Sequence, residues 1–117
     1  MLRKLELEGN KLGQKSLVEF SNALLYNKTL KCLDLESNKL FEAVSIVQLT
    51  KDKEKNGEIA KPGIQLFCAA LQANKTLISL NIANNGLKPD SGKHFRNIFE
   101  HNYSLIDFEF HFNDFHL

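Results

Sequence analysis

One pattern of leucine and asparagine recurs four times along the chain and constrains its fold more than any other feature. Each copy has apolar residues at its first, fourth, sixth and eleventh positions and Asn at its ninth. The four copies span residues 2–12, 30–40, 77–87 and 105–115. A frame that recurs at such intervals predicts a solenoid, in which each repeat buries its apolar face against its neighbours.

The first part of each repeat has the pattern of a short strand followed by a turn. The fourth and sixth positions are two residues apart, so on an extended strand they point to the same face, which we expect to be the core. The Asn at the ninth position falls where the chain leaves the strand, and its amide can satisfy backbone groups that the turn leaves unpaired. Stacked repeats would align these residues in a ladder: Asn10, Asn38, Asn85 and Asn113.

The second part of each repeat has helical periodicity. Apolar residues at spacings of three and four define one face of each helix. These are Phe20, Ala23 and Leu24, then Phe67, Ala70 and Leu71, then Phe95, Ile98 and Phe99. We expect helices at about residues 16–26, 63–73 and 91–101. Ser16 and Ser91 are candidate N-caps, and Asn27, Asn74 and Asn102 are placed to end the helices in a left-handed conformation.

The frame, with its 28-residue spacing and helices that end in Ala-Leu-x-x-Asn-x-Thr-Leu, resembles the ribonuclease-inhibitor-like class of leucine-rich repeats. The resemblance covers nearly the whole chain. It implies an α/β leucine-rich repeat solenoid of about four repeats, with short parallel strands on the concave face and helices on the convex face. It also implies a protein-binding function.

The last repeat replaces leucines by aromatic residues at Phe108 and Phe110, and Phe112 follows them. This repeat resembles the ends of leucine-rich repeat subunits of ciliary axonemes and, more loosely, the closing repeat of tropomodulin. Both resemblances imply a cytoskeletal partner. The simpler interpretation, which we favour, is that Phe fills a wider space at the end of a tapering core.

Repeat two is irregular, because Leu77 follows Leu30 by 47 positions where the other repeats are spaced by 28. The extra residues place an insertion at residues 41–58. A β-prone apolar run within it precedes a charged stretch, so we expect a hairpin or an ordered flap at the rim of the solenoid. Either its apolar residues bind a partner, or the insertion is tolerated because lengthening a loop costs little. The candidate partner-binding residues are Val44, Ile46, Val47 and Leu49.

The concave face is the second candidate site, formed by the residues that alternate with the leucines. Its candidate partner-binding residues are Glu6, Glu8, Cys32, Asp34, Glu36, Asn81, Asp107, Glu109 and His111. One column is expected to contain Glu6, Asp34, Asn81 and Glu109. Like charges repel at the strand spacing of about 4.8 Å, and a basic partner would relieve that repulsion. The alternative is a merely soluble face that Arg3, Lys4 and Lys31 partly neutralise.

Other kinds of chemistry find no support in the sequence. The four His residues lack metal-ligand spacing, no nucleophile has a base placed beside it, and no phosphate-binding loop is present, so we predict no enzyme activity, no metal and no cofactor. Cys32 and Cys68 fall in different repeats and are predicted to be free thiols. The glycosylation motifs at Asn27, Asn74 and Asn102 recur because the repeat recurs, and we expect them to stay unmodified.

Composition favours a cytoplasmic domain. A net charge of +1 gives no electrostatic case for a nucleic-acid or membrane partner, and no apolar run approaches about 18 residues. We expect residues 1–117 to form a single array that is a fragment of a longer one, with further repeats or a partner covering both ends. The predicted function is a protein-interaction scaffold, in the cytoskeleton or a ciliary axoneme. The alternative is a structural spacer without a discrete binding site.

Overall fold

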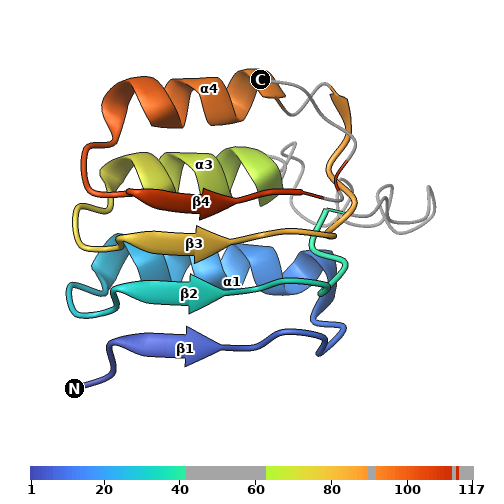
Figure 1. Ribbon diagram of the computed structural model, residues 1–117, viewed down its shortest axis with the longest axis horizontal. Helices are drawn as coiled ribbons and strands as arrows, with labels where there is room; N and C mark the ends of the chain where they lie inside the picture. Colours follow the sequence, from blue (N-terminus) through green and yellow to red (C-terminus); the bar gives the residue numbers. More distant parts are fainter. Residues whose placement is uncertain (42–62, 90–91, 112, 114–117) are drawn as a thin grey trace, which may run out of the picture.

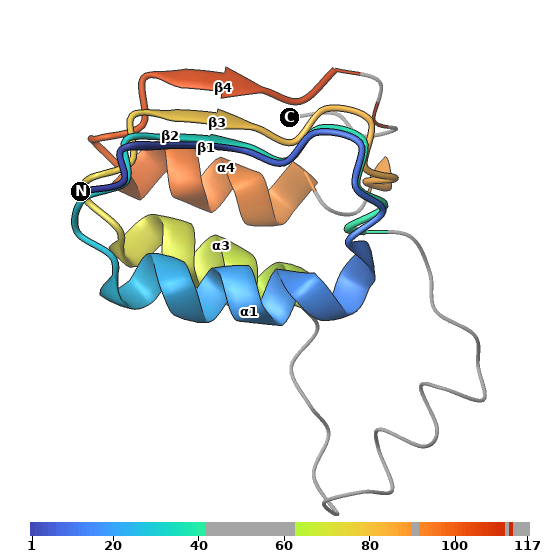
Figure 2. The ribbon, with the colours of Figure 1, turned by 90° about the horizontal axis from the view of Figure 1, so that it is seen from below.

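The computed structural model describes residues 1–41, 63–89, 92–111 and 113. Four parallel strands form one sheet in the order β1-β2-β3-β4, and the helices of the described part all pack on one side of it (Figures 1 and 2). The elements are β1 Lys4–Glu6, α1 Gly13–Tyr26, β2 Cys32–Asp34, α3 Gly63–Ala73, β3 Ser79–Asn81, α4 Gly92–His101 and β4 Asp107–Glu109. The predicted leucine-rich repeat solenoid is therefore confirmed.

The strands are aligned without any slip in register, and this alignment builds the core. Residues at the fourth position of the frame pair directly across the sheet: Leu5, Leu33, Leu80 and Phe108. Leu80 is fully buried and Leu33 nearly so, whereas Leu5 and Phe108 are half-buried because β1 and β4 each pair on one side. The sixth position also faces inward, with Leu35 and Ile82 fully buried. The prediction that these positions form the core is confirmed.

The helices bury the predicted apolar faces with two exceptions. Phe67, Ala70 and Leu71 of α3 are almost completely buried, since α3 lies between α1 and α4. Each large apolar side chain buried in this way contributes about 1.5–3 kcal/mol relative to an exposed one. Ala23 of α1 and Phe99 of α4 were expected in the core, but both are exposed. Among the described elements, the helices of these two residues each pack against a single neighbouring helix, α3.

The expected N-cap at Ser16 was wrong, whereas the one expected at Ser91 is not tested by the described residues. Helix α1 begins at Gly13, three residues before the predicted start, and its N-cap residue is Leu12, which has no side-chain cap. Ser16 is therefore inside the helix, where its hydroxyl donates to the Leu12 carbonyl oxygen at 2.7 Å. Helix α4 begins at Gly92, and Ser91 lies outside the described residues.

The asparagines after the helices stabilise the chain in a different way from the one predicted. Asn27 has φ −75° and ψ 128°, which is an extended and not a left-handed conformation. Its side-chain oxygen instead accepts the backbone N–H groups of Thr29 at 2.9 Å and Leu30 at 2.7 Å. Asn74 and Asn102 make the same pair of bonds in their own repeats.

The amide groups of these asparagines also join neighbouring repeats. Asn74 Nδ2 donates to the Leu24 carbonyl oxygen at 2.9 Å, and Asn102 Nδ2 donates to that of Leu71 at 2.6 Å. The left-handed prediction is therefore wrong, because the side chain itself satisfies the orphan groups at the helix end. These bonds form an additional asparagine ladder at the helix ends, which was not predicted from the sequence.

The predicted ladder at the other end of the strands is confirmed. Asn38 Oδ1 accepts the Asn10 N–H, Asn85 Oδ1 accepts the Asn38 N–H, and Asn113 Oδ1 accepts the Asn85 N–H, each at 2.9 Å. Their Nδ2 groups donate back to carbonyl oxygens of the preceding repeat. Since Asn38 and Asn85 are fully buried, these bonds satisfy polar groups that water does not reach.

Aromatic rings fill the space between α4 and β4. Phe108 stacks on Phe95 with ring centroids 5.7 Å apart and contacts Phe99 edge-on at 5.1 Å. Phe110 lies beside Phe108 at 5.3 Å. For these residues the packing interpretation of the aromatic last repeat accounts for the contacts observed.

Candidate protein-binding face

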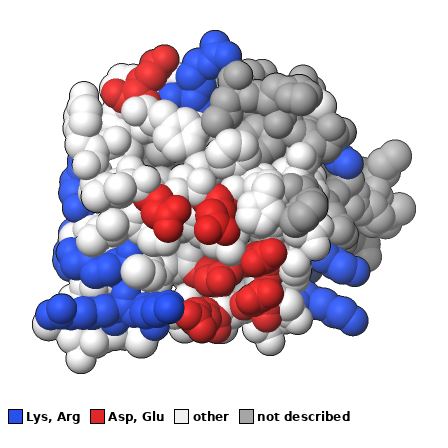
Figure 3. Space-filling model, in the orientation of Figure 1, with Lys and Arg blue, Asp and Glu red and all other residues white. Residues whose placement is uncertain are grey.

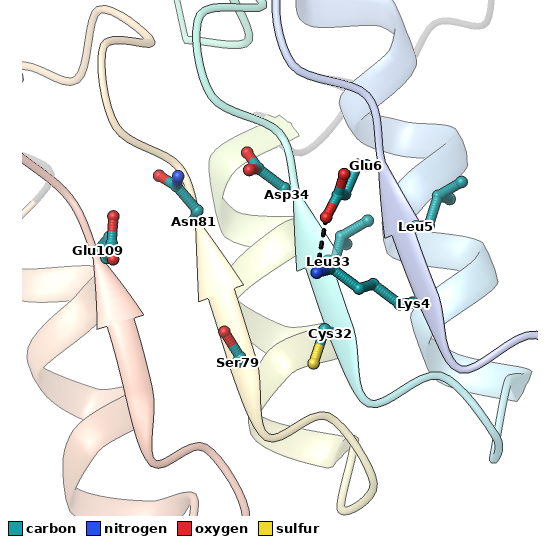
Figure 4. A pocket seen from close by; sticks show the side chains of 9 residues that line it. All are labelled: Lys4, Leu5, Glu6, Cys32, Leu33, Asp34, Ser79, Asn81 and Glu109. Atoms are coloured by element: carbon teal, nitrogen blue, oxygen red, sulfur yellow. Dashed lines mark ion pairs between the residues drawn. The ribbon is translucent and has the colours of Figure 1, made fainter.

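The open face of the sheet presents the side chains that alternate with the buried ones. The strand register places Glu6, Asp34, Asn81 and Glu109 in one row, as predicted. Lys4, Cys32, Ser79 and Asp107 form the row before it. Figure 4 shows all of these side chains except that of Asp107, on four neighbouring strands. The parallel pairing alone therefore brings together residues that are far apart in the sequence.

A shallow hollow of about 190 Å³ lies in the middle of this face. Its lining includes the predicted site residues Glu6, Cys32, Asp34, Asn81 and Glu109. Lys4 and Ser79 also line it, although they were not among the predicted site residues. They occupy the same position of the frame as Cys32, and that equivalence was the signal that could have identified them.

Beyond the strand ends, a third row contains Glu8, Glu36, Ala83 and His111. The backbone bonds from Gly9 to Glu36, from Ser37 to Ala83 and from Asn84 to His111 align it. Ala83 is fully buried, so the row has no side chain rising from β3's repeat. The hollow is not lined by the remaining predicted residues of these rows, which are Glu8, Glu36, Asp107 and His111.

The carboxylates concentrate over the C-terminal ends of β1 and β2. We call Glu6, Glu8, Asp34 and Glu36 the acidic patch. One carboxylate oxygen from each of Glu8, Asp34 and Glu36 lies within 4.8 Å of the others. Figure 3 shows the acidic side chains gathered on the sheet face, with lysine and arginine at its edges. Like charges at such distances raise the free energy of the unliganded face.

Local hydrogen bonds fix two members of this face. Asp34 Oδ1 accepts the Glu36 N–H at 3.0 Å, and Asn81 Oδ1 accepts the Ala83 N–H at 2.9 Å in the next repeat. Asn81 Nδ2 also donates to Glu36 Oε2 at 3.1 Å. Asn81 therefore holds the Glu36 carboxylate in place across the strands.

Basic residues neutralise little of the patch. Lys4 Nζ lies 2.7 Å from Glu6 Oε1, and within the described ranges this is the only ion pair (Figure 4). The hydrogen bond that Lys4 donates to Glu6, and the negative charge of Glu6, raise the pKa of Lys4. Arg3 and Lys31 precede the strands, at the end opposite the patch, and among the described residues no basic side chain pairs with Asp34 or Glu36.

The two cysteines have different surroundings. Cys68 is buried in α3, and burial raises the pKa of its thiol to about 12, so the reactive thiolate is disfavoured. Cys32 is half-buried in the lining of the hollow. Neither thiol is in a disulfide bond.

The second candidate site, with Val44, Ile46, Val47 and Leu49, lies outside the described residues. Phe41 is described and is anchored to the core. Its N–H donates to the Asn85 carbonyl oxygen at 3.0 Å, and its ring packs edge-on against Phe67 and Phe95. In the part of the chain that is described, no helix has the length and apolar character needed to cross a membrane.

Comparison with known proteins agrees with this architecture. The family model described as "Leucine Rich repeat" matches residues 26–42 and 73–94. The fold is similar to a solved structure titled "Leiomodin-1 Actin-Binding Site 2 (ABS2)", with a TM-score of 0.68 and 20% sequence identity. The match covers 95% of this chain and 53% of the leiomodin-1 chain, so this chain spans about half the length of that one. A search among curated proteins gives no match. The chain thus has the leucine-rich repeat fold.

Proposed function

We propose that this chain is a protein-interaction module that binds a basic segment of a protein partner on the open face of its sheet. The observation that carries the proposal is the acidic patch beside the hollow, in which Asp34 and Glu36 form no ion pair with any described basic residue. A face with closely spaced carboxylates on rigid strands is a preorganised site for Lys or Arg.

Each part of the face has a role in this proposal. Glu8, Asp34 and Glu36 accept hydrogen bonds from guanidinium or ammonium groups, which are the strongest hydrogen bonds available at a surface. Asn81 keeps the Glu36 carboxylate in position. Glu6, Glu109 and Cys32 line the hollow that receives the cationic side chain. Asp107 and His111 flank the hollow on the β4 side.

The proposed setting is the cytoplasm, with a cytoskeletal partner. The similar solved structure has a title that names an actin-binding site, and the aromatic last repeat resembles tropomodulin. The resemblance to axonemal subunits, which rests on the same repeat alone, suggests a ciliary axoneme. The insertion, with Val44, Ile46, Val47 and Leu49, is proposed as a second contact.

The second candidate function is a structural spacer, in which further repeats or a partner stack against the ends of the array. The observation that favours it is that β1 and β4 are the outer strands of the sheet, with no further strand of the described residues beside them. Enzyme activity is not part of either proposal.

A charge-matched pair of variants tests the binding proposal. The variant Asp34→Asn/Glu36→Gln removes two charges from the patch but keeps the oxygen atoms that accept the local hydrogen bonds. The control Glu19→Gln/Glu100→Gln removes two charges from exposed helix positions. Fluorescence anisotropy with a labelled peptide of alternating Arg and Ser, and co-sedimentation with actin filaments, measure binding.

The proposal requires native and control proteins to bind the peptide alike and the patch variant to bind about tenfold more weakly or worse. If both variants weakened peptide binding equally, the peptide would be held by the overall negative charge and not by the acidic patch, which would contradict the proposal. Loss of actin binding in the patch variant alone supports a cytoskeletal partner. If actin fails to bind while the peptide binds, only the choice of actin is overturned.

A further inference from the structure

The edge where the helices lead into the strands has a charge and composition opposite to those of the acidic patch. We call residues 1–3, 26–31, 73–78 and 101–106 the helix-to-strand edge. It contains Arg3, Lys28, Lys31 and Lys75 but no Asp or Glu. The nearest carboxylates along the chain, Glu100 and Asp107, belong to α4 and β4. A chain with a net charge of only +1 thus separates its charges between two surfaces.

Large apolar side chains are also exposed on this edge. Tyr26 is 82% exposed, Tyr103 is 86% exposed and Ile106 is 82% exposed. Leu2 and Ile78 are exposed too. Isolated exposed apolar residues are ordinary, but apolar and basic residues that share one edge indicate an interaction surface.

Backbone hydrogen bonds arrange four of these residues in a continuous row. The Lys31 N–H donates to the Arg3 carbonyl oxygen at 2.7 Å, the Ile78 N–H donates to that of Lys31 at 2.8 Å, and the Ile106 N–H donates to that of Ile78 at 2.8 Å. At a strand spacing of about 4.8 Å the row is about 14 Å long, which about four residues of an extended peptide span. Its β1–β2 half is basic and its β3–β4 half is apolar.

The edge is rigid before any partner arrives. The side chains of Asn74 and Asn102 connect their loops to the preceding repeat. Thr29 Oγ1 donates to the Leu2 carbonyl oxygen at 3.2 Å, and Lys75 Nζ donates to that of His101 at 3.3 Å. A surface fixed in this way loses little conformational entropy on binding.

We propose that the helix-to-strand edge is a second protein-binding surface, which takes an acidic segment with apolar side chains beside its carboxylates. Charge complementarity selects the acidic character: carboxylates pair with Arg3 and Lys31, while apolar side chains of the segment cover Ile78 and Ile106. The fixed order of basic and apolar halves favours a peptide over lipid headgroups, which would impose no order along the row. This surface does not overlap the acidic patch, so it is independent of the proposed function.

Selection from a displayed library of random peptides tests this inference. Peptides are selected on the native protein and then screened against Arg3→Glu/Lys31→Glu. The control Lys15→Glu/Lys88→Glu makes the same charge change at exposed positions outside the edge. Thermal unfolding shows that each variant is folded. The variant Tyr103→Ser/Ile106→Ser tests the apolar half without any change in charge.

The expected result is a class of peptides rich in Glu or Asp and in Leu, Ile or Phe. These should bind the native and control proteins alike and lose about tenfold or more in affinity with both edge variants. Three results would overturn the inference: no peptides that depend on Arg3 and Lys31, dependent peptides without carboxylates, or binding to phosphatidylserine vesicles that is stronger than peptide binding and depends on the same residues.

Discussion

Asn85 Oδ1 accepts the backbone N–H of Asn38 at 2.9 Å, although 47 positions separate the two residues in the sequence. Elsewhere in this ladder the donor and acceptor are 28 positions apart. The longer second repeat therefore leaves the asparagine ladder unbroken. Asn85 Oδ1 also accepts the N–H of Leu40, the last residue before the insertion, at 3.2 Å.

Replacement of Asn85 by Ala should be among the most destabilising single changes. It would leave the buried Asn38 N–H and the Leu35 carbonyl oxygen without their partners. Each such group costs about 1–3 kcal/mol, so we expect a loss of about 3 kcal/mol or more in the free energy of unfolding. Urea denaturation measures it. Asn10→Ala is the control, because the Asn10 side chain is exposed and bonds only within its own turn. Similar losses for both variants would contradict the role of the ladder.

Replacement of Lys39 by Gly should stabilise the chain. Lys39 has φ 58°, a left-handed conformation that costs a residue with a Cβ about 1–2 kcal/mol, and Gly86 occupies the equivalent place in the next repeat. Part of the gain is lost to the greater entropy of Gly in the unfolded chain, so the net gain is about 0.5–1 kcal/mol. Thermal unfolding should show a higher Tm. Lys88→Gly, at an exposed position without positive φ, should show no gain.

Neutralising the acidic patch should stabilise the unliganded chain. Asp34→Asn/Glu36→Gln removes repulsion among closely spaced carboxylates, and we expect about 0.5–1 kcal/mol at low ionic strength. At about 1 M salt the difference from the native protein should nearly vanish, since screening then acts over about 3 Å. Urea denaturation at both salt concentrations provides the test. An equal gain in the free energy of unfolding at both salt concentrations would show that repulsion among the carboxylates is not its source.

Cys68 should make the chain less stable in alkali. Its pKa is raised from 9.0 to about 12 by burial, so the folded state keeps the proton that the unfolded state releases. The free energy of unfolding should therefore be unaffected by this thiol below pH 9.0. Between there and about 12 it should fall by up to about 1.4 kcal/mol per pH unit. The variant Cys68→Ala should lack this component of the fall, which comparison of the two pH profiles measures.

The two thiols should also differ in reactivity. At neutral pH iodoacetamide should modify Cys32 first, because Cys68 is buried and its thiolate is disfavoured. Mass spectrometry of digested protein at successive times gives both rates. Denaturation in urea should bring the two rates together. A faster reaction at Cys68 in the folded protein would contradict the buried placement of the α3 face.

Much of the fold could be predicted because the same pattern of apolar residues and asparagine recurs in every repeat. The two-residue spacing of Leu33 and Leu35 placed both in the core, and the ninth-position asparagines were correctly assigned to a ladder. Errors occurred where one local conformation had several physical solutions. Asn27 could end its helix through a left-handed backbone or through its side chain, and periodicity does not distinguish the two.

The candidate face was predictable in its rows but not in its charge balance. The frame alone put Glu6, Asp34, Asn81 and Glu109 in one row. Whether Arg3 and Lys31 would neutralise that row depended on which end of each strand they occupy and on side-chain directions. The exposure of Ala23 and Phe99 likewise depended on which helices have a neighbour on both sides.

The central claim is that the acidic sheet face binds a basic protein segment. A titration of the ¹⁵N-labelled protein with the Arg-Ser peptide, followed by amide chemical shifts, tests it most directly. The account predicts saturable shifts confined to residues 6–9, 32–37 and 79–83, and their loss in Asp34→Asn/Glu36→Gln. Shifts spread evenly over the helices and the sheet, or unchanged in that variant, would contradict it.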